Sequence, residues 1–242
     1  MQAWFEKFKA DFVLNFVQAN RWKYLLNGLG NTLLITLLSG LLGIVIGVLI
    51  AMVRSTYDKT REGARMTVGR RLFGVLNGFC RVYLTVLRGT PVVVQLMIIF
   101  FVIFASSDNG VMVASLAFGL NSGAYVAEIV RGGIMSIDQG QFEAGRSLGF
   151  NYFQTMRFVI IPQTIKNVLP SLANEFIALL KETSVAGYVA VMDLTKGGDI
   201  IRSRTYSPFM PLIAVALIYL VFVMFFSKLV SLLERRLRSS DH

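Results

Sequence analysis

The chain has 242 residues, of which 55% are apolar and 16% charged, and its formal net charge is +10. A soluble domain is nearer a quarter charged, and long apolar runs recur here in windows of about 20 residues, so the composition excludes an ordinary soluble globule. The basic excess is typical of the cytoplasmic loops of a membrane protein and does not indicate nucleic-acid binding. The single cysteine, Cys80, excludes an internal disulfide.

Residues 1–27 are not expected to cross the membrane, and no cleavable signal peptide is expected in them. Aromatic residues recur at helical spacing with charged residues between them, namely Trp4, Phe5, Phe8, Phe12 and Phe16. This pattern predicts an amphipathic helix that lies in the membrane interface. A helix packed against the flank of the protein itself is an equally good interpretation.

Five apolar segments follow, each long enough for one transmembrane helix. They are expected at about 31–53, 82–104, 111–130, 171–191 and 209–230. The predicted fold is therefore an all-α integral membrane protein, with a transmembrane domain over 28–235 and a short tail over 236–242. In the first span, Gly43 and Gly47 are spaced so that a neighbouring helix can approach closely.

Five spans place the two termini on opposite sides, so the distribution of basic residues predicts the orientation. With the N-terminus outside, the inner segments 54–81, 131–168 and 228–242 hold fifteen Lys and Arg residues, and the outer segments hold seven. Lysine and arginine favour the cytoplasmic side. The sequence therefore predicts an outer N-terminus and a cytoplasmic C-terminus.

One predicted cytoplasmic segment, about 142–157, is helical in pattern but too polar and too short to span a bilayer. Gly145 and Gly149 lie four residues apart, which on one helix makes a smooth face beside Phe150. Pro162 is expected to stop the helix or to turn the chain. The segment suits docking into a groove of another protein, and an ordinary amphipathic connector is the alternative.

The motif EAGRSLG (143–149), with VIIP at 159–162, resembles the EAA loop of importer permeases in the ABC transporter superfamily. Three other stretches resemble the branch that imports polar amino acids: RGTP (88–91), GLNSGAYVAEIVRGGI (119–134) and NEFIALLKETS (174–184). Gly145 stands where the signature has alanine, and Glu182 stands where many relatives have aspartate. The resemblance covers roughly residues 27–235.

The resemblance implies a type I ABC importer fold in which the segment at about 142–157 is the coupling helix. The residues it assigns to contact with the ATPase are Glu143, Ala144, Gly145, Gly149, Phe150 and Pro162. It also implies a second permease chain, either identical or related, a cytoplasmic ATPase dimer and an extracytoplasmic amino-acid-binding protein. ATP and Mg are expected on the ATPase, because this chain has no phosphate-binding loop and no metal-ligand cluster. The expected location is the bacterial inner membrane, where the chain spans the bilayer several times among its lipids.

Ionisable residues inside a bilayer are costly and are therefore candidates for function. Glu175 and Glu182 lie seven apart, so a helix places them on one face. Glu182 is expected in the substrate pathway with the hydroxyls of Thr183 and Ser184, and an ion pair of Glu182 with Arg88 or Lys181 is the alternative. For Glu175 the alternative is a polar contact between helices. The two glutamates tilt the expected substrate toward a cationic amino acid.

Other pathway candidates surround the second and third spans. Pro91 removes a backbone donor, and irregular backbone at membrane depth lines a cavity or is buried, so Arg88, Thr90 and Gln95 are candidates beside it. A simple proline kink is the alternative. Polar residues of the third span complete the set, and they serve equally well as contacts between helices: Asn121, Ser122, Tyr125 and Glu128.

The function that follows is ATP-driven import of polar amino acids by a non-enzymatic transport subunit. A self-sufficient ion-coupled transporter or channel is the alternative from another class. It predicts an internal repeat with a broken helix in each half, and the chain shows no such repeat. A membrane scaffold is less consistent with buried Glu175, Lys181 and Glu182.

Overall fold

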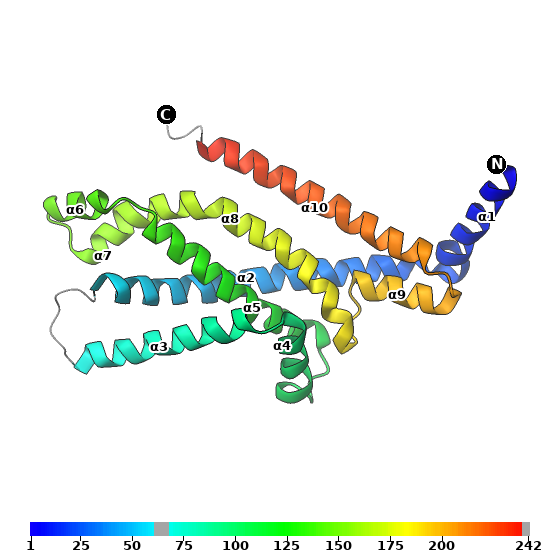
Figure 1. Ribbon diagram of the computed structural model, residues 1–242, viewed down its shortest axis with the longest axis horizontal. Helices are drawn as coiled ribbons and strands as arrows, with labels where there is room; N and C mark the ends of the chain where they lie inside the picture. The colour runs from blue at the N-terminus through cyan, green and yellow to red at the C-terminus, as the bar shows by residue number, and fades with distance from the viewer. Residues whose placement is uncertain (61–67, 239–242) are drawn as a thin grey trace. The chain divides into compact units, whose positions relative to one another are not determined.

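A computed structural model describes residues 1–60 and 68–238, and every regular element within these two ranges is helical (Figure 1). Part of the predicted basic segment 54–81 and most of the predicted tail 236–242 lie outside the described residues. The α-helices are α1 (Gln2–Phe12), α2 (Trp22–Thr60), α3 (Val68–Gly89), α4 (Val92–Ile98), α5 (Gly110–Met135), α6 (Gln139–Ser147), α7 (Tyr152–Thr155), α8 (Ile161–Glu182), α9 (Leu194–Thr205) and α10 (Phe209–Arg238). Short π- or 3₁₀-helical segments are η1 (Val13–Val17), η2 (Gln18–Asn20), η3 (Ile99–Ile103), η4 (Met156–Ile160) and η5 (Thr183–Val189).

Three described helices are long and apolar enough to cross a membrane, and they contain the first, third and fifth predicted spans. They cover Trp22–Asp58, Gly110–Met135 and Phe209–Leu237, and the bent pair Val68–Gly89 and Val92–Ile103 adds a fourth if it counts as one span. The predicted span 171–191 does not qualify among the described helices, because α8 carries polar residues throughout and changes to η5 after Glu182. The described residues thus contain three or four candidate spans, and the fifth stays a prediction.

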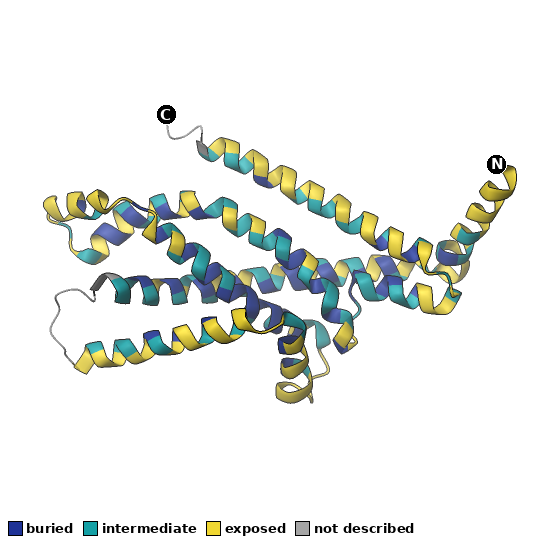
Figure 2. Cartoon of the chain, viewed as in Figure 1, coloured by how far each residue is buried: buried dark blue, intermediate teal, exposed yellow. Residues whose placement is uncertain are grey.

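These helices differ in how far they are covered by the rest of the chain (Figure 2). Two thirds of the apolar window of α5 is buried, whereas only about a tenth of that window in α10 is buried. An exposed apolar surface of this length is what a lipid environment covers. We therefore expect α10 to lie against lipid or another chain, while α5 is enclosed.

The chain forms two compact units. The first unit comprises residues 1–39, 92–118 and 177–229, and the second comprises the described residues of 40–91, 119–176 and 230–242.

In the second unit, close approach of α2 and α5 depends on glycines from both helices. A Cβ added to Gly47 would lie 2.5 Å from a Val126 methyl, and one added to Gly43 would lie 3.0 Å from Ser122 Oγ. A Cβ on Gly119 would lie 2.7 Å from Leu42. The helix contact predicted from the small residues at 43 and 47 is confirmed.

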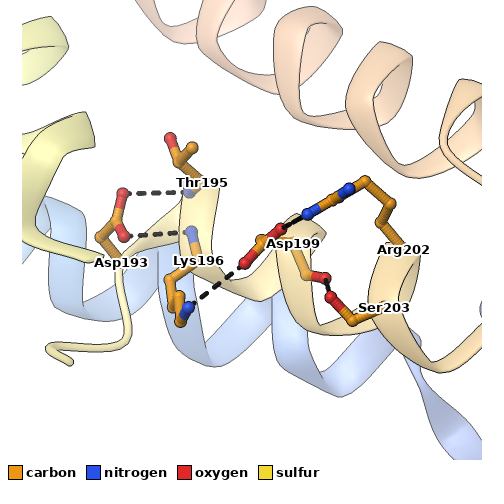
Figure 3. Close-up of polar contacts among 6 residues, drawn as sticks. All are labelled: Asp193, Thr195, Lys196, Asp199, Arg202 and Ser203. Atoms are coloured by element: carbon orange, nitrogen blue, oxygen red, sulfur yellow. Dashed lines mark hydrogen bonds and ion pairs between the residues drawn. The ribbon is translucent and has the colours of Figure 1, made fainter. Parts of the chain in front are cut away.

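In the first unit, the start of α2 packs against α9, which the sequence did not predict as a helix. Leu25, Leu194 and Ile201 form part of one buried cluster, and the Leu194 backbone N–H donates to Thr32 Oγ1 at 3.0 Å. The Asp193 carboxylate caps α9 by accepting from the backbone N–H groups of Thr195 and Lys196, each at 3.0 Å (Figure 3).

Two carboxylates of this region have opposite pKa shifts. Burial raises the pKa of Asp193, and the capping hydrogen bonds offset part of that shift. Hydrogen bonds from Arg202 and Lys196 lower the pKa of the half-buried Asp199. Figure 3 shows Asp199 between these two cationic side chains, with Ser203 Oγ donating to its backbone carbonyl at 2.8 Å.

Helix α2 begins at Trp22, within the segment 1–27 that was predicted to lie outside the spans. Ala19 and Asn20 have positive φ angles and separate the first 17 residues from α2. No residue of α1 is buried, but Asn15 is: its Nδ2 donates to Ser207 Oγ at 3.2 Å and its Oδ1 accepts from Thr205 Oγ1 at 2.8 Å. The segment is thus held at Asn15, while α1 itself has no buried face.

Candidate translocation and coupling sites

A charged cavity of about 600 Å³ lies in the second unit, among the end of α2, the end of α3 and the middle of α5. We call it the basic cavity; its lining residues are Arg54, Arg81, Leu84, Thr85, Arg88, Gly89, Tyr125 and Glu128. Three of the predicted pathway residues, Arg88, Tyr125 and Glu128, are brought together here. Arg54 and Arg81 were not predicted, since both had been counted only as topology signals.

Glu128 is the centre of the charge network in this cavity. Its Oε1 lies 3.1 Å from Arg54 Nη1 and 3.9 Å from Arg88 Nη1, and its Oε2 lies 4.0 Å from Arg131 Nε. Arg131 in turn pairs with Asp58 at 3.2 Å. The guanidinium of Arg88 lies 5.7 Å from the Tyr125 ring centroid, a cation–π distance. One carboxylate is therefore shared by three arginines.

Two further polar residues of α5 contact neighbouring helices. Asn121 Nδ2 donates to the Leu87 carbonyl at 3.2 Å. Ser122 Oγ donates to Glu175 Oε1 at 3.0 Å. Both side chains are buried, and Glu175 makes the contact between helices that was one of its two interpretations. The geometry here is that of a polar helix interface.

The predicted break in the second span is present at residues 90–91, between α3 and α4. Thr90 is exposed, and its Oγ1 donates to the Val86 carbonyl at 2.8 Å, so it ends α3 locally. Pro91 begins the connection to α4. Gln95 lies in the first unit and is buried, so the structure does not place it in the basic cavity.

The run 181–184 also lies in the first unit. Glu182 is the last residue of α8 and is half-buried, while Lys181 beside it is exposed. Thr183 is fully buried and its Oγ1 donates to the Leu180 carbonyl at 2.8 Å, and Ser184 is half-buried in η5. The ion pair that the structure does show for Arg88 is with Glu128.

The predicted coupling segment is two short helices and not one helix over 142–157. Helix α6 ends at Ser147, Gly149 adopts a φ of +81°, and Asn151 starts α7 with a capping box to Gln154. Gly145 and Gly149 therefore do not share a helix face, so that prediction was wrong. The prediction for Pro162 was also wrong, because the helix continues from η4 into α8 across this residue.

The side chains of this segment divide into a buried and an exposed set. Gly145 is buried, and a Cβ there would lie 2.7 Å from Thr155. Glu143 and Ala144 are exposed, and Phe150 is half-buried. The largest exposed apolar side chains are Leu148 and Phe153, 74% and 78% exposed. Leu148 was missed as a candidate, although an apolar residue beside a turn glycine is a recognisable signal.

Three or four described helices of membrane length and a charged cavity lined by α2, α3 and α5 are features of a multi-pass membrane protein. The chain belongs to the family described as binding-protein-dependent transport system inner membrane component, whose profile matches residues 43–239. Members of this family are transport subunits and not enzymes.

Named relatives and solved structures agree with this assignment. The glutamine transport system permease protein GlnP of Escherichia coli (strain K12) is 36% identical over 201 residues, covering 73% of this chain and 92% of that protein. A structure titled as an amino acid ABC transporter with histidines is 39% identical, with a TM-score of 0.78 over 91% of this chain and 97% of that one. A chain of the MetNI methionine ABC transporter shares the fold at 21% identity, with a TM-score of 0.73 over 88% of this chain and 96% of that one.

Proposed function

We propose that the chain is a membrane subunit of an ATP-driven importer of polar amino acids. The similarity that carries this proposal is to the glutamine permease and to the amino acid ABC transporter structure. Because glutamine has a neutral side chain, we propose a polar amino acid as the substrate and do not keep the predicted preference for a cationic one. We include five spans, an outer N-terminus and a bacterial inner-membrane location in the proposal.

The partners proposed are a second permease chain, two cytoplasmic ATPase subunits that bind ATP and Mg, and an extracytoplasmic binding protein. ATP binding would draw the ATPase subunits together and move the α6–α7 segments of the two permease chains. That motion would switch the pathway from inward-facing to outward-facing, and hydrolysis would reset it. Each site in this scheme requires its own test.

Reconstitution tests the transport function. Proteoliposomes that contain the permease, its ATPase and a loaded binding protein should accumulate radiolabelled glutamine only when ATP is present. Uptake driven by an ion gradient without ATP would instead establish the ion-coupled alternative. A permease prepared without the ATPase is the control, and it should show no uptake under either condition.

We propose that Leu148 and Phe153 are the apolar anchors of the ATPase contact. Both are exposed on the α6–α7 segment, and truncation of an aromatic anchor at an interface typically costs 2 kcal/mol or more. Phe153→Ala should therefore weaken ATPase binding by at least about tenfold and leave the melting temperature unchanged. Phe209→Ala, an exposed phenylalanine at the start of α10, is the matched control. If Phe153→Ala binds the ATPase as tightly as Phe209→Ala and the unmodified permease do, Phe153 is not an anchor of this contact.

We propose that Glu182 contacts the substrate, with Thr183 and Ser184 beside it. Glu182→Gln keeps the size of the side chain and removes its charge. The loss of a charge-assisted hydrogen bond should lower uptake by about tenfold or more while basal ATPase activity and melting temperature persist. A combined loss of stability and basal ATPase activity would instead show an internal ion pair. Glu6→Gln, the same change on the exposed α1, is the control.

The orientation is tested with impermeant thiol reagents on intact cells. Ser107 and Ser147 are both exposed, and the proposed topology places Ser107 outside and Ser147 inside. In a Cys80→Ser background, Ser107→Cys should be labelled and Ser147→Cys should not. The reverse pattern would invert the topology and remove the α6–α7 segment from the cytoplasm.

A further inference from the structure

The basic cavity carries more positive charge than its own acidic residue neutralises. Its lining holds the guanidinium groups of Arg54, Arg81 and Arg88 against the one carboxylate of Glu128. Arg131 contacts the same carboxylate but is also paired with Asp58. The lining therefore has a formal excess of two positive charges.

The donors of this cavity are incompletely used. Arg54 Nε is buried and has no hydrogen-bond partner within the described part of the chain. No carboxylate of residues 1–60 or 68–238 forms an ion pair with Arg81. A buried donor such as Arg54 Nε is costly unless a partner satisfies it, whereas Arg81 and Arg88 are exposed to solvent. The cavity thus combines one unused buried donor with two accessible guanidinium groups, a composition that suits an anion.

From this composition we propose that the basic cavity binds the α-carboxylate of the transported amino acid. The guanidinium group is planar and presents paired N–H donors that match the two oxygens of a carboxylate. Arg88 is held over the Tyr125 ring and beside Glu128, so one of the donors is positioned before any ligand arrives. A volume of about 600 Å³ is sufficient for a free amino acid.

The charge of the cavity also selects among amino acids. A lysine or arginine side chain would bring a third excess positive charge into the cavity, whereas a neutral or acidic side chain would not. We therefore assign neutral and acidic polar amino acids as the substrate class. This inference rests on the proposed function. Glu128 can bind the ammonium group of the substrate only if one of its arginine partners releases it.

The same chemistry would accept the phosphate of an anionic lipid headgroup. Arg54 and Glu128 lie at the ends of the first and third predicted spans, where headgroups are also found. The cavity is lined by α2, α3 and α5 of the second unit and is largely open. We assign it to a small free carboxylate, and the experiment separates this ligand from a lipid headgroup.

The test compares three ligands on the purified permease–ATPase complex. L-glutamine should bind the unmodified complex, whereas glutamine α-amide, which lacks the carboxylate, and L-arginine should each bind at least about tenfold more weakly. Arg81→Gln should weaken L-glutamine binding by about tenfold and leave the weak binding of the α-amide unchanged. Arg71→Gln, the same change at an exposed position of α3 outside the cavity, should bind L-glutamine as the unmodified complex does.

Each contrary result has a distinct meaning. Equal affinity of Arg81→Gln and the unmodified complex for L-glutamine would overturn the inference. Loss of bound phosphatidylglycerol from Arg81→Gln in native mass spectrometry, with glutamine affinity unchanged, would also overturn it and assign the cavity to a lipid headgroup. Absence of ATP-dependent uptake of any amino acid by the unmodified complex would instead refute the proposed function. Since Arg81 is exposed, the melting temperature of Arg81→Gln should confirm that the variant folds.

Discussion

The contact between Glu128 and Arg54 gives a quantitative test of the charge network. Glu128→Gln keeps the side-chain volume but leaves three arginines without their shared carboxylate. The two charged groups lie 3.1 Å apart, and the side chains of Arg54 and Glu128 are 15% and 29% exposed. A surface ion pair contributes about 0.2–1 kcal/mol, and breaking a fully buried pair costs about 3–5 kcal/mol. The Arg54–Glu128 pair lies between these two cases. We expect a coupling energy between these limits, about 1–2 kcal/mol.

A double-mutant cycle with Glu128→Gln, Arg54→Gln and the double variant measures this energy. For a chain of this size about 1 kcal/mol corresponds to roughly 2–4 °C in melting temperature, so Glu128→Gln should melt some 2–8 °C lower in detergent. The double variant should be more stable than the sum of the single losses predicts, because neither charge is left alone. Additivity within about 0.5 kcal/mol would show that the two side chains do not interact, and the shared-carboxylate description would be wrong.

Three further predictions concern stability. Gly47→Ala should destabilise the protein by about 1–3 kcal/mol, because the added methyl group overpacks against Val126. Gly30→Ala on the same helix, where a Cβ meets nothing within 4 Å, should stabilise the protein by up to about 1 kcal/mol. Equal shifts of the melting temperature in the two variants would refute this prediction. Asp193→Ala should lose about 1 kcal/mol and Asp193→Asn should lose less, since asparagine also caps and its neutral amide is easier to bury than a carboxylate whose pKa burial raises. Asp199 has a lowered pKa, so its charged form stabilises the folded protein above the ordinary pKa of aspartate, and this stabilisation disappears at lower pH. The difference in melting temperature between the unmodified protein and Asp199→Asn should therefore shrink on acidification. A difference that stays constant with pH would contradict this prediction.

The spans were the easiest part of the fold to predict, because a bilayer requires about 20 consecutive apolar residues. The span predicted at 171–191 does not meet this requirement among the described helices, because α8 carries Glu175, Lys181 and Glu182 and changes to η5 after Glu182, so this span stays a prediction. Helix α9 was missed because a short polar helix stabilised by a cap resembles a loop in composition. Its Asp193 cap is a signal that could have identified it.

The α6–α7 segment shows the limit of spacing arguments. Two glycines four residues apart make one face only if both are helical, and the sequence alone does not distinguish a helical glycine from one with a positive φ. Gly145 is of the first kind and Gly149 of the second. Reading Asn151 as a cap, with Gln154 three residues later, would have placed the break correctly.

The candidate site was predicted in part. Arg88, Tyr125 and Glu128 were identified because charged or polar residues in apolar spans are unusual. Arg54 and Arg81 lie at the borders of spans, where basic residues are common for topological reasons, and only their arrangement around one cavity distinguishes them. Which helix borders converge in space is not encoded in the local pattern.

The unbroken run of helix from α7 through η4 into α8 has a mechanical consequence. Between Tyr152 and Glu175 the second unit holds a single strut, roughly 35 Å long at 1.5 Å per residue. Because no loop interrupts this run, a displacement of α7 would move α8 with it. Bending would be easiest at the π-helical turn of η4 and at Pro162 and Pro170, which cannot donate a backbone hydrogen bond.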